Sequence, residues 1–477
     1  MIGSTGPDRL DDALDEGDAV ASDPLTLDPS PSPRRLTLLR PPFRWSAATA
    51  AFQIEGARSA DGRGRSIWDD FVDTPGAVKD GSTAEPGPDS WRRSAEDVAL
   101  LDRLGVDRYR FSVSWTRVQP GGRGNANRAA LDTYSRLVDE LLGEGITPFP
   151  TLYHWDLPSE LEAEGGWLQR ETAFRFADFA ALVIDALGDR VRHWYTINEP
   201  VSTTLQGYAI GELAPARQLL FDALPTVHHQ LLAHGLAQQI VRDADAGEVG
   251  IVNNHTHVSA ATDSADDRDA AAAYDALHNH LFADPLFFGE YPDLGALGIP
   301  GQPVHDGDLA LIAAPSDFYG VNFYNPTVVG AASPEAPIPF SLQPVPGADV
   351  TGFGWPIVPA ALTEVLLGLR SRYGAALPPV IVGENGASFP EPSRSAGRIE
   401  DTERIAYLAA HIEAIADANE RGADVREYTV WSLLDNFEWA EGFSQRFGLV
   451  HVDHETSQRT PKASYEWYRA LIEEARA

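Results

Sequence analysis

The sequence contains no cysteine, and this absence excludes several kinds of chemistry at once. With 0 Cys among 477 residues, the chain can form no disulfide, no thiolate metal site and no thiol nucleophile. The first residues also show no basic segment followed by an apolar run, so we expect no secretory signal. Both features fit a reducing compartment, and we therefore expect a cytoplasmic protein.

Lysine is almost missing as well, and acidic residues dominate the charge. Lys79 and Lys462 are the only lysines, and 37 Lys and Arg residues against 70 Asp and Glu residues give a net charge of −33. Such a chain repels phosphate backbones, so we expect no nucleic-acid partner. No uninterrupted apolar run approaches the length of about 18 residues that a membrane-spanning helix needs, so we expect no membrane span.

Two motifs of common enzyme classes are also missing. No Gly-x-Gly-x-x-Gly follows the first predicted strand, and no other glycine-rich loop is suited to cradle a phosphate. The Gly-x-Ser-x-Gly motif that places a nucleophilic serine on a sharp turn is absent. Dinucleotide chemistry and Ser-His-Asp catalysis therefore have no support in the sequence.

Composition divides the chain into a short tail and one large domain. Residues 1–41 are rich in aspartate and then in proline and serine at Pro29–Pro33. Such a segment buries too little apolar surface to offset the entropy that ordering it would cost. We therefore predict a disordered tail over residues 1–41 and a single domain over residues 42–477.

In this domain, short β-like runs alternate with stretches of helical periodicity. Alternation of this kind indicates parallel strands, and eight repeats favour a closed (β/α)₈ TIM barrel over an open doubly wound sheet. The predicted strands are Trp45–Ala50, Arg108–Val113, Thr147–Leu152, Arg192–Ile197, Val249–Asn253, Phe318–Asn322, Val380–Val382 and Glu427–Trp431.

Apolar stripes and one long connection complete this prediction. Residues from Phe176 to Leu187 and from Leu131 to Leu142 repeat apolar side chains every three or four positions, which is typical of a helix with one buried face. The Pro/Gly-rich segment Thr327–Pro359 is predicted to be an extended loop after the sixth strand. In a barrel such a loop borders the functional face, so we expect it to shape substrate access.

Two glutamates lie almost half the chain apart, each at the end of a predicted strand. Glu199 stands in Thr196–Pro200 (TINEP) and Glu384 in Gly383–Gly386 (GENG). Because a barrel collects the carboxyl ends of its strands on one face, we expect the two carboxylates to meet across its mouth. Hydrolysis of a glycosidic bond needs two such groups, about 5 Å apart for retention of configuration and about 6.5–9.5 Å apart for inversion. Either glutamate alone could be an ordinary loop carboxylate, but together they make a retaining β-glycosidase the leading hypothesis.

Other strand ends carry residue types that bind sugars. Sugar hydroxyls need polar partners, and the C–H faces of sugar rings stack on aromatic side chains. Each such residue is more often structural when it occurs alone, but the set is hard to explain as packing. Its members are Gln53, Arg110, His154, Trp155, Asn322, Tyr324, Trp431, Glu438 and Trp439.

Histidine pairs offer a competing hypothesis, a metal site. His228 and His229 are adjacent, so on a helix they point about 100° apart and share one ion poorly. His255 and His257 alternate along a possible strand, which would place them on one face. We favour the glycosidase interpretation and expect neither a metal nor a cofactor.

These motifs resemble glycoside hydrolase family 1, and its β-glucosidases in particular. The resemblance extends from about Phe43 to the C-terminal helix. It implies a (β/α)₈ barrel that hydrolyses β-glycosides with retention, acting on a small-molecule glycoside or a short oligosaccharide. The motifs are WSAATA at 45–50, QIEG at 53–56, YRFSVSW at 109–115, LYHWDLP at 152–158, TINEP at 196–200, GVNFY at 320–324, GENG at 383–386 and WSLLDNFEW at 431–439.

The resemblance also assigns roles to individual residues. By similarity, Glu199 is the acid/base, Glu384 is the nucleophile and Asn198 binds the sugar's 2-hydroxyl. The residues expected to support the nucleophile are Arg110, Asn322 and Tyr324. The other expected substrate-binding residues are Gln53, His154, Trp155, Tyr324, Trp431, Glu438 and Trp439.

One residue departs from the family pattern. The family usually has threonine before the nucleophile, where this chain has Gly383. A lost hydroxyl and a looser backbone are expected to affect how the nucleophile is positioned, and not the class of reaction.

Two alternatives remain open. The 6-phospho-β-glycosidases resemble this chain but need Ser, Lys and Tyr in the eighth loop to hold a phosphate, whereas residues 438–447 here contain no Lys and two glutamates. A non-catalytic sugar-binding protein would keep the pocket, although both carboxylates are present here. The sequence does not choose among glucose, galactose and fucose, with glucose favoured by family habit. Trp355 is a candidate stacking platform for the aglycone.

Overall fold

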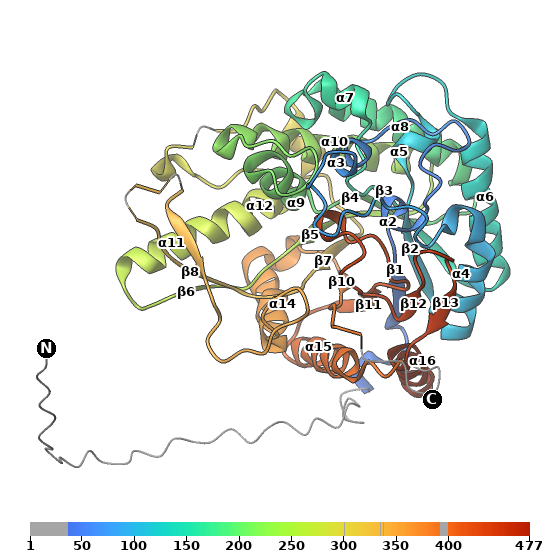
Figure 1. The fold of residues 1–477 in the computed structure, drawn as a ribbon. Coiled ribbons are helices and arrows are strands. Elements are labelled where there is room, and N and C mark those ends of the chain that lie inside the picture. The colour runs from blue at the N-terminus through green and yellow to red at the C-terminus, as the bar shows by residue number, and fades with distance from the viewer. Residues whose placement is uncertain (1–36, 300, 334, 337, 392–398) are drawn as a thin grey trace, which may run out of the picture.

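The computed structural model shows a closed barrel of eight parallel strands surrounded by helices (Figure 1). It describes residues 37–299, 301–333, 335–336, 338–391 and 399–477. Around the barrel the strands follow the order β1-β11-β10-β7-β5-β4-β3-β2. Their bounds are β1 (Arg44–Ala48), β2 (Arg108–Ser112), β3 (Thr147–Tyr153), β4 (His193–Asn198), β5 (Glu248–Asn254), β7 (Phe318–Asn322), β10 (Val380–Asn385) and β11 (Val425–Trp431).

Helices connect successive strands and cover the outside of the barrel, as the parallel pairing requires. In the described part of the chain, no helix is both long enough and apolar enough to cross a membrane. The α-helices are α2 (Ala51–Ile54), α3 (Ile67–Val72), α4 (Ser90–Leu104), α5 (Trp115–Val118), α6 (Arg128–Gly143), α7 (Ser159–Ala163), α8 (Glu171–Leu187), α9 (Pro200–Ser202), α10 (Pro225–Asp243), α11 (Ala265–Asp275), α12 (Leu281–Phe287), α13 (Asp308–Ile312), α14 (Pro359–Tyr373), α15 (Thr402–Glu420) and α16 (Ala463–Arg476).

Short 3₁₀ and π turns extend or join these helices. The 3₁₀ turns are η1 (Thr37–Leu39), η2 (Gly166–Leu168), η4 (Leu220–Ala223), η6 (Gly295–Leu297), η7 (Gly374–Ala376) and η8 (Trp439–Glu441). The π turns are η3 (Thr203–Ile210) and η5 (Ala276–His280).

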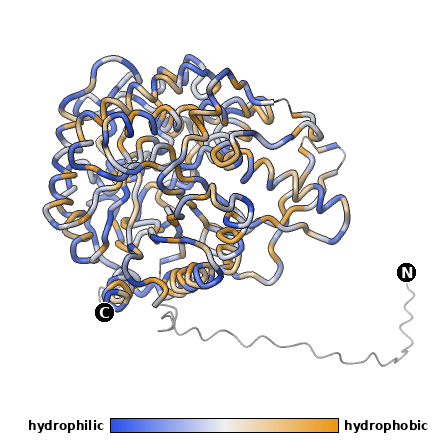
Figure 2. The backbone as a smooth tube through the Cα atoms, turned by 180° about the vertical axis from the view of Figure 1, so that it is seen from behind, coloured by the Kyte–Doolittle hydropathy of each residue, from blue (hydrophilic) through white to orange (hydrophobic). Residues whose placement is uncertain are grey.

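All eight predicted strands are present, with bounds that differ by a few residues. The apolar stripe predicted between Phe176 and Leu187 is buried in α8. The stripe of α6 is buried from Leu131 to Leu141, but Leu142 is 40% exposed, contrary to the prediction. Along the outer helices, hydrophobic and hydrophilic residues alternate (Figure 2), as expected of helices that bury one face against a barrel.

A small apolar cluster fills the barrel interior, apart from the main core that lies between strands and helices. Its members come from five neighbouring strands, and all are buried. This cluster, called the floor below, lies inside the barrel beneath the residues at the carboxyl ends of the strands. It consists of Phe149, Tyr195, Val252, Phe318 and Ile381.

The segment Thr327–Pro359 is not the strandless loop that was predicted. It contains β8 (Thr327–Ala331) and β9 (Phe340–Gln343), which form a three-stranded sheet with β6 (Val258–Ala260). β8 pairs with a strand about 70 residues earlier in the chain, and a local pattern carries no information on such a partner. A second small sheet pairs β12 (Val450–Val452) with β13 (Arg459–Pro461).

The predicted boundary between tail and domain also needs correction. Residues 1–36, which hold nearly all of the predicted disordered tail, lie outside the described residues. The turn η1 falls within the predicted tail, yet Leu39 is only 1% exposed and belongs to the main core. The domain therefore includes Thr37–Leu39 rather than beginning at residue 42.

Candidate active site

Glu199 and Glu384 lie on two barrel strands that are separated by β5 and β7. Glu199 directly follows β4, as predicted, and occupies the N-cap of α9 with φ of +46°. Glu384 lies within the last residues of β10, which is longer than the predicted Val380–Val382. Both side chains are buried, with exposures of 4% and 3%. The carboxyl ends of the strands therefore bring together two glutamates that are 185 positions apart.

Glu384 is held by a cation and a phenol. Arg110 Nη1 donates to Glu384 Oε1 at 2.6 Å and to the carbonyl oxygen of Gly383 at 2.9 Å. Tyr324 Oη donates to Glu384 Oε2 at 2.7 Å. The rest of the guanidinium is also engaged, because its Nη2 donates to Asn198 Oδ1 at 2.7 Å and its Nε to Thr151 Oγ1 at 3.1 Å. Both carboxylate oxygens of Glu384 thus accept hydrogen bonds, one of them from a cation.

Glu199 has only neutral hydrogen-bond partners. Asn322 Nδ2 and Asn254 Nδ2 donate to its Oε1 at 2.7 and 3.2 Å, and Ser202 Oγ donates to its Oε2 at 2.7 Å. Burial and, secondly, the charge of Glu384 raise the pKa of Glu199 to about 7, against the opposing effect of these three hydrogen bonds. The site therefore holds one carboxyl group that keeps its proton near neutral pH and one that is paired with a cation.

Asn198 and His154 orient each other. The amide oxygen of Asn198 accepts from Arg110 and from Asn322, so its Nδ2 faces His154 Nε2 at 3.1 Å and donates to it. Burial, and then the charge of Arg110, lower the pKa of His154 well below its ordinary value, so the ring is neutral. The ring proton therefore resides on Nδ1, which is buried and has no partner among the described residues. His154 can donate this hydrogen bond to a ligand.

Gln53 and Glu438 form a second polar group. Gln53 Nε2 donates to the carbonyl oxygen of Phe437 at 2.9 Å, which leaves its Oε1 buried and unpartnered in the described chain. Burial, and then the charge of Glu384, raise the pKa of Glu438 to about 8. Near neutral pH these two residues therefore present an amide oxygen and a carboxylic acid that can bind hydroxyl groups.

Aromatic rings adjoin these polar groups. Trp439 lies 4.7 Å from Trp155 and 4.4 Å from Trp68 between ring centroids. Trp431 stacks on His154 with the centroids 5.8 Å apart. Trp155 and Trp439 have φ of +77° and +47°, and Glu199 shares this left-handed backbone. Strained backbone at three predicted site residues is typical of functional sites.

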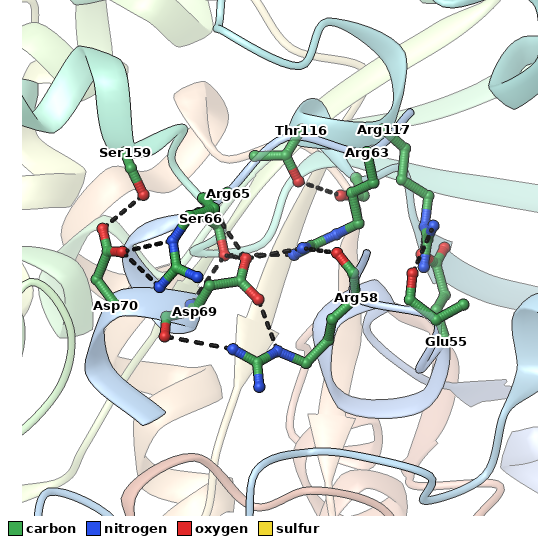
Figure 3. A network of polar contacts seen from close by, with 12 residues as sticks. Glu55, Arg58, Arg63, Arg65, Ser66, Asp69, Asp70, Thr116, Arg117 and Ser159 are labelled. Atoms are coloured by element: carbon green, nitrogen blue, oxygen red, sulfur yellow. Dashed lines mark hydrogen bonds and ion pairs between the residues drawn. The ribbon is translucent and has the colours of Figure 1, made fainter. Parts of the chain in front are cut away.

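A polar network fixes the helix that carries Trp68 (Figure 3). Asp69 accepts hydrogen bonds from Arg58 Nε and Arg63 Nη1, both at 2.7 Å. It also accepts from the backbone nitrogen of Ser66 at 2.7 Å, which completes a capping box at the start of α3. Arg63, Arg58 and these bonds leave the pKa of Asp69 below its usual range, although burial acts in the other direction. Because Trp68 precedes Asp69, the network positions the ring that lies behind Trp439.

Asn322 does not play the predicted role. It was expected to support Glu384, but its side chain donates to Glu199 and to Asn198 instead. Three further residues that contact the site were missed: Thr151, Ser202 and Asn254. Ser202 lies three positions after Glu199 in a helical turn, and Asn254 ends β5, so helix spacing and the strand-end rule could have found both.

Trp355, the predicted aglycone platform, belongs to an aromatic group. It stacks on Phe353 with the ring centroids 4.2 Å apart and lies 5.3 Å from Tyr324. Because Tyr324 also binds Glu384, this group adjoins the Glu384 side of the site.

The histidine pairs considered as metal ligands are engaged in other contacts. His228 lies within hydrogen-bond distance of Asp308 and Tyr291, and His229 of the Trp167 carbonyl oxygen. His255 follows the end of β5, so the strand expected to carry His255 and His257 does not include them. Both ring nitrogens of His255 already face partners, Asn279 and Tyr319.

One other group of possible ligands occurs in the described chain, formed by Glu391, Asp435 and His451. Lys462 Nζ lies 2.8 Å from Asp435 and 3.1 Å from Glu391, and Arg446 Nη1 lies 3.0 Å from Asp435. Protein cations therefore neutralise these carboxylates, and the site does not need an ion.

Comparison with known proteins places this geometry in a family. The model of glycosyl hydrolase family 1 matches residues 37–477. The chain is 44% identical over 447 residues to the thermostable beta-glucosidase B of Thermobispora bispora, covering 90% of this chain and 89% of that protein. It is 42% identical over 454 residues to a bifunctional beta-D-glucosidase/beta-D-fucosidase of Bifidobacterium breve, covering 90% of this chain and 97% of the relative.

A solved structure agrees with these relatives. The β-glucosidase of Thermotoga maritima in complex with glucoimidazole superimposes with a TM-score of 0.86 at 39% identity, covering 91% of this chain and 98% of that chain. The fold over 91% of this chain is thus shared with a β-glucosidase that was solved in complex with glucoimidazole.

Proposed function

Because this chain belongs to glycosyl hydrolase family 1, we propose that it is a retaining β-glucosidase that releases terminal β-D-glucosyl residues from small glycosides. Its membership makes it a glycoside hydrolase, and the proposal concerns mechanism and substrate. The observation that carries it is the unequal treatment of two carboxyl groups in one site. Glu384 is paired with Arg110, whereas the pKa of Glu199 is raised to about 7.

In the first step, Glu199 protonates the glycosidic oxygen while the carboxylate of Glu384 attacks the anomeric carbon. The bond to the leaving group breaks and a glycosyl ester forms on Glu384. This ester carries no charge, so the second factor that raises the pKa of Glu199 is lost. Glu199 then serves as a base for the attacking water, and cleavage of the ester restores Glu384 with net retention.

The polar atoms without partners are the proposed contacts for the sugar. Gln53 Oε1 accepts from a hydroxyl and His154 Nδ1 donates to one. Glu438, whose Oε2 accepts only a long bond of 3.4 Å from Gln53 Nε2, binds a further one. Asn198, fixed by Arg110, binds the 2-hydroxyl, as the family resemblance implies. The rings of Trp431, Trp439 and Trp155 supply the apolar surface that a sugar face needs.

A neutral glucoside is favoured over a phosphorylated one. Glu438 and Glu441 lie in the eighth loop, and Lys79, which pairs with Glu441, is an exposed side chain. Near neutral pH the protonated Glu438 supplies no positive charge to attract a phosphate dianion, and the carboxylate of Glu441 opposes its binding. Glucose is the proposed glycone because the relatives are named for it, while the bifunctional relative makes fucose the first alternative to assay.

Azide rescue tests the two assignments separately. Glu384→Gly should be inactive on 2,4-dinitrophenyl β-glucoside, and azide should restore turnover with α-glucosyl azide as product, because the anion attacks from the nucleophile's side. Glu199→Ala should still form the ester with this activated leaving group, and azide should give β-glucosyl azide. If the two variants gave the same anomer, or if neither responded, the roles assigned to the glutamates would be wrong.

A cytoplasmic location is part of the proposal and rests on the lack of cysteine alone. Fractionation of the native host, with activity assayed in each fraction, tests it. Activity in a secreted or membrane fraction would contradict it.

A further inference from the structure

The floor beneath Glu384 contains an aromatic side chain with a fixed orientation. Tyr195 of β4 stacks on Phe149 with the ring centroids 4.4 Å apart and the planes 5° from parallel. It meets Phe318 edge-on at 5.2 Å. The side chain is completely buried, and its neighbours on both sides hold the ring in one plane.

The guanidinium that binds Glu384 lies over this ring. The central carbon of Arg110 is 4.9 Å from the centroid of the Tyr195 ring. All hydrogen bonds of Arg110 leave from the edge of its planar group, so the ring contacts the guanidinium by its remaining surface. A cation is attracted to the face of an aromatic ring, and more strongly where water is excluded, as it is around Arg110 at 1% exposure.

Gly320 on β7 leaves room that Tyr195 and Val252 occupy, and Gly383 on β10 lies next to the Tyr195 hydroxyl. A Cβ on Gly320 of β7 would lie 2.8 Å from Tyr195 Cε1. A Cβ on Gly383 of β10 would lie 3.4 Å from Tyr195 Oη, and 3.0 Å from both Asn322 Oδ1 and Val252 Cγ2. Tyr195 therefore extends from β4 to within ordinary contact distance of the position before Glu384.

We propose that Tyr195 is a positioning residue for Glu384, which packs against the guanidinium of Arg110 in the space that Gly320 leaves. This inference rests on the proposed role of Glu384 as nucleophile. Arg110 Nη1 binds the Gly383 carbonyl oxygen as well as Glu384 Oε1, so a guanidinium held by Tyr195 fixes both the backbone and the carboxylate. This support offsets the looser backbone that Gly383 would otherwise bring.

The first test removes the Tyr195 ring and compares the effect with removal of another ring, Phe318, from the same interior cluster. Tyr195→Leu should lower kcat on 4-nitrophenyl β-glucoside about 10- to 100-fold with KM changed less than about threefold, because the nucleophile is misplaced and the sugar contacts remain. Tyr195→Phe, which keeps the ring, should recover most of this loss. Phe318→Leu removes a ring that contacts Tyr195 but forms no cation–π contact with Arg110, and should lower the Tm while changing kcat less than about twofold.

Equal losses of kcat in Tyr195→Leu and Phe318→Leu would show that the ring acts only by packing and would overturn the proposal. A loss that appears in KM alone would do the same.

A second test stays informative if Tyr195→Leu fails to fold. Phenylalanine and 3,4,5-trifluorophenylalanine at position 195 have nearly the same shape, but fluorine withdraws charge from the ring face. The trifluoro variant should have a kcat about threefold or more below the phenylalanine variant, at a similar Tm. Equal kcat values would contradict support of Arg110 by the ring.

The two proposals can fail separately. If azide rescues Glu384→Gly and the wild-type product is retained, an absent fluorine effect overturns only the role of Tyr195. If azide does not rescue Glu384→Gly, the assignment of Glu384 as nucleophile is wrong, and so is the proposed role of Tyr195 in positioning it.

Discussion

At the scale of single residues, the site depends on how differently two chemically identical side chains are surrounded. Glu384 has Arg110 and Tyr324 as donors, and Glu199 has two amides and a hydroxyl. Burial raises the pKa of Glu199, and only Glu384 lies beside a cation, Arg110. One carboxyl group is therefore available as an acid and the other as a nucleophile at the same pH.

The hydroxyl of Ser202 tunes the acid. It donates to Glu199 Oε2 at 2.7 Å and lowers the pKa of Glu199 from what burial alone would give. Because the first step needs protonated Glu199, kcat/KM should fall as pH rises through about 7. Ser202→Ala removes a hydrogen bond that stabilises the charged form of Glu199, so the pKa of Glu199 should rise. The fall of kcat/KM on the basic side of the pH profile (the basic limb) should then occur at higher pH. A pH profile of kcat/KM measures this shift.

Asn254→Ala removes another donor to Glu199 and should move the basic limb in the same direction. A limb that stays fixed or moves to lower pH in both variants would contradict the assignment of that limb to Glu199.

Glu438 connects function with pH-dependent stability. Its pKa is about 8 in the folded protein, above the ordinary value of about 4.3. Between these values the unfolded chain loses the proton and the folded one keeps it, so this group makes stability fall as pH rises. Glu438→Gln should therefore gain stability relative to the wild type between pH 5 and pH 8.5, by up to a few kcal/mol, because at pH 5 the wild type has lost only about 1 kcal/mol through this group. Urea unfolding at the two pH values measures this.

The same variant should lose activity because an amide replaces a group that binds the sugar. If the stability of Glu438→Gln relative to the wild type were the same at pH 8.5 and at pH 5, the raised pKa assigned to Glu438 would be contradicted.

Residue-level prediction from sequence was strongest where motif and strand end coincide. Arg110 lies on β2, Glu384 on β10 and Tyr324 two residues after β7, yet their contacts agree with the expected ones. Asn322 was assigned to the wrong glutamate because a strand position does not tell which of two nearby carboxylates the amide reaches. Tyr195 was not expected at all, since an interior aromatic residue has no motif and its partner Gly383 is on a distant strand.

At the scale of elements, helix α3 depends on one buried carboxylate. Asp69 is 2% exposed and pairs with Arg58 and Arg63, and it closes the capping box with Ser66. Asp69→Asn leaves two guanidinium groups without their anion, which should cost about 3 kcal/mol. It should also raise KM more than it lowers kcat, because Trp68 no longer holds Trp439 in place. Thermal unfolding and steady-state kinetics measure the two effects.

Asp70→Asn is the matched control on the same helix. Asp70 is about half exposed and pairs with Arg65, which is also exposed (Figure 3). Its stability should change by less than about 1 kcal/mol, and its KM should not change. Similar effects of the two substitutions would refute a special role for Asp69.

Elements of the barrel were predictable because most strands are short runs of apolar or aromatic residues, interrupted by a few polar ones as in β2, and are buried on both sides. The stripe of α8 was predictable for a related reason, since one helix face packs on the barrel. The strands β8 and β9 were not, because Thr327–Ala331 is stabilised by pairing with Val258–Ala260 rather than by its own pattern.

At the scale of the whole molecule, the net charge affects stability, whereas the fold determines the geometry of the site. The barrel buries the site. The excess of acidic residues gives a net charge of −33, and these charges repel one another across the surface. Raising NaCl from 0.01 to 0.1 M shortens the screening length from about 30 to about 10 Å. The Tm should rise by a few degrees, and KM for a neutral glucoside should change little. Tetramethylammonium chloride at equal ionic strength should give the same shift.

A Tm that falls with added salt would mean that surface ion pairs outweigh the net repulsion. A rise with Na⁺ alone would indicate specific ion binding instead of screening.

The central claim is that Glu384 attacks the anomeric carbon, and the product's first anomeric form tests it most directly. Proton NMR of the hydrolysis of 4-nitrophenyl β-glucoside, recorded within the first minutes before mutarotation, separates α- from β-glucose. The account predicts β-glucose as the first product, since two displacements restore the starting configuration. Early α-glucose would mean direct attack by water and would contradict the nucleophilic role of Glu384.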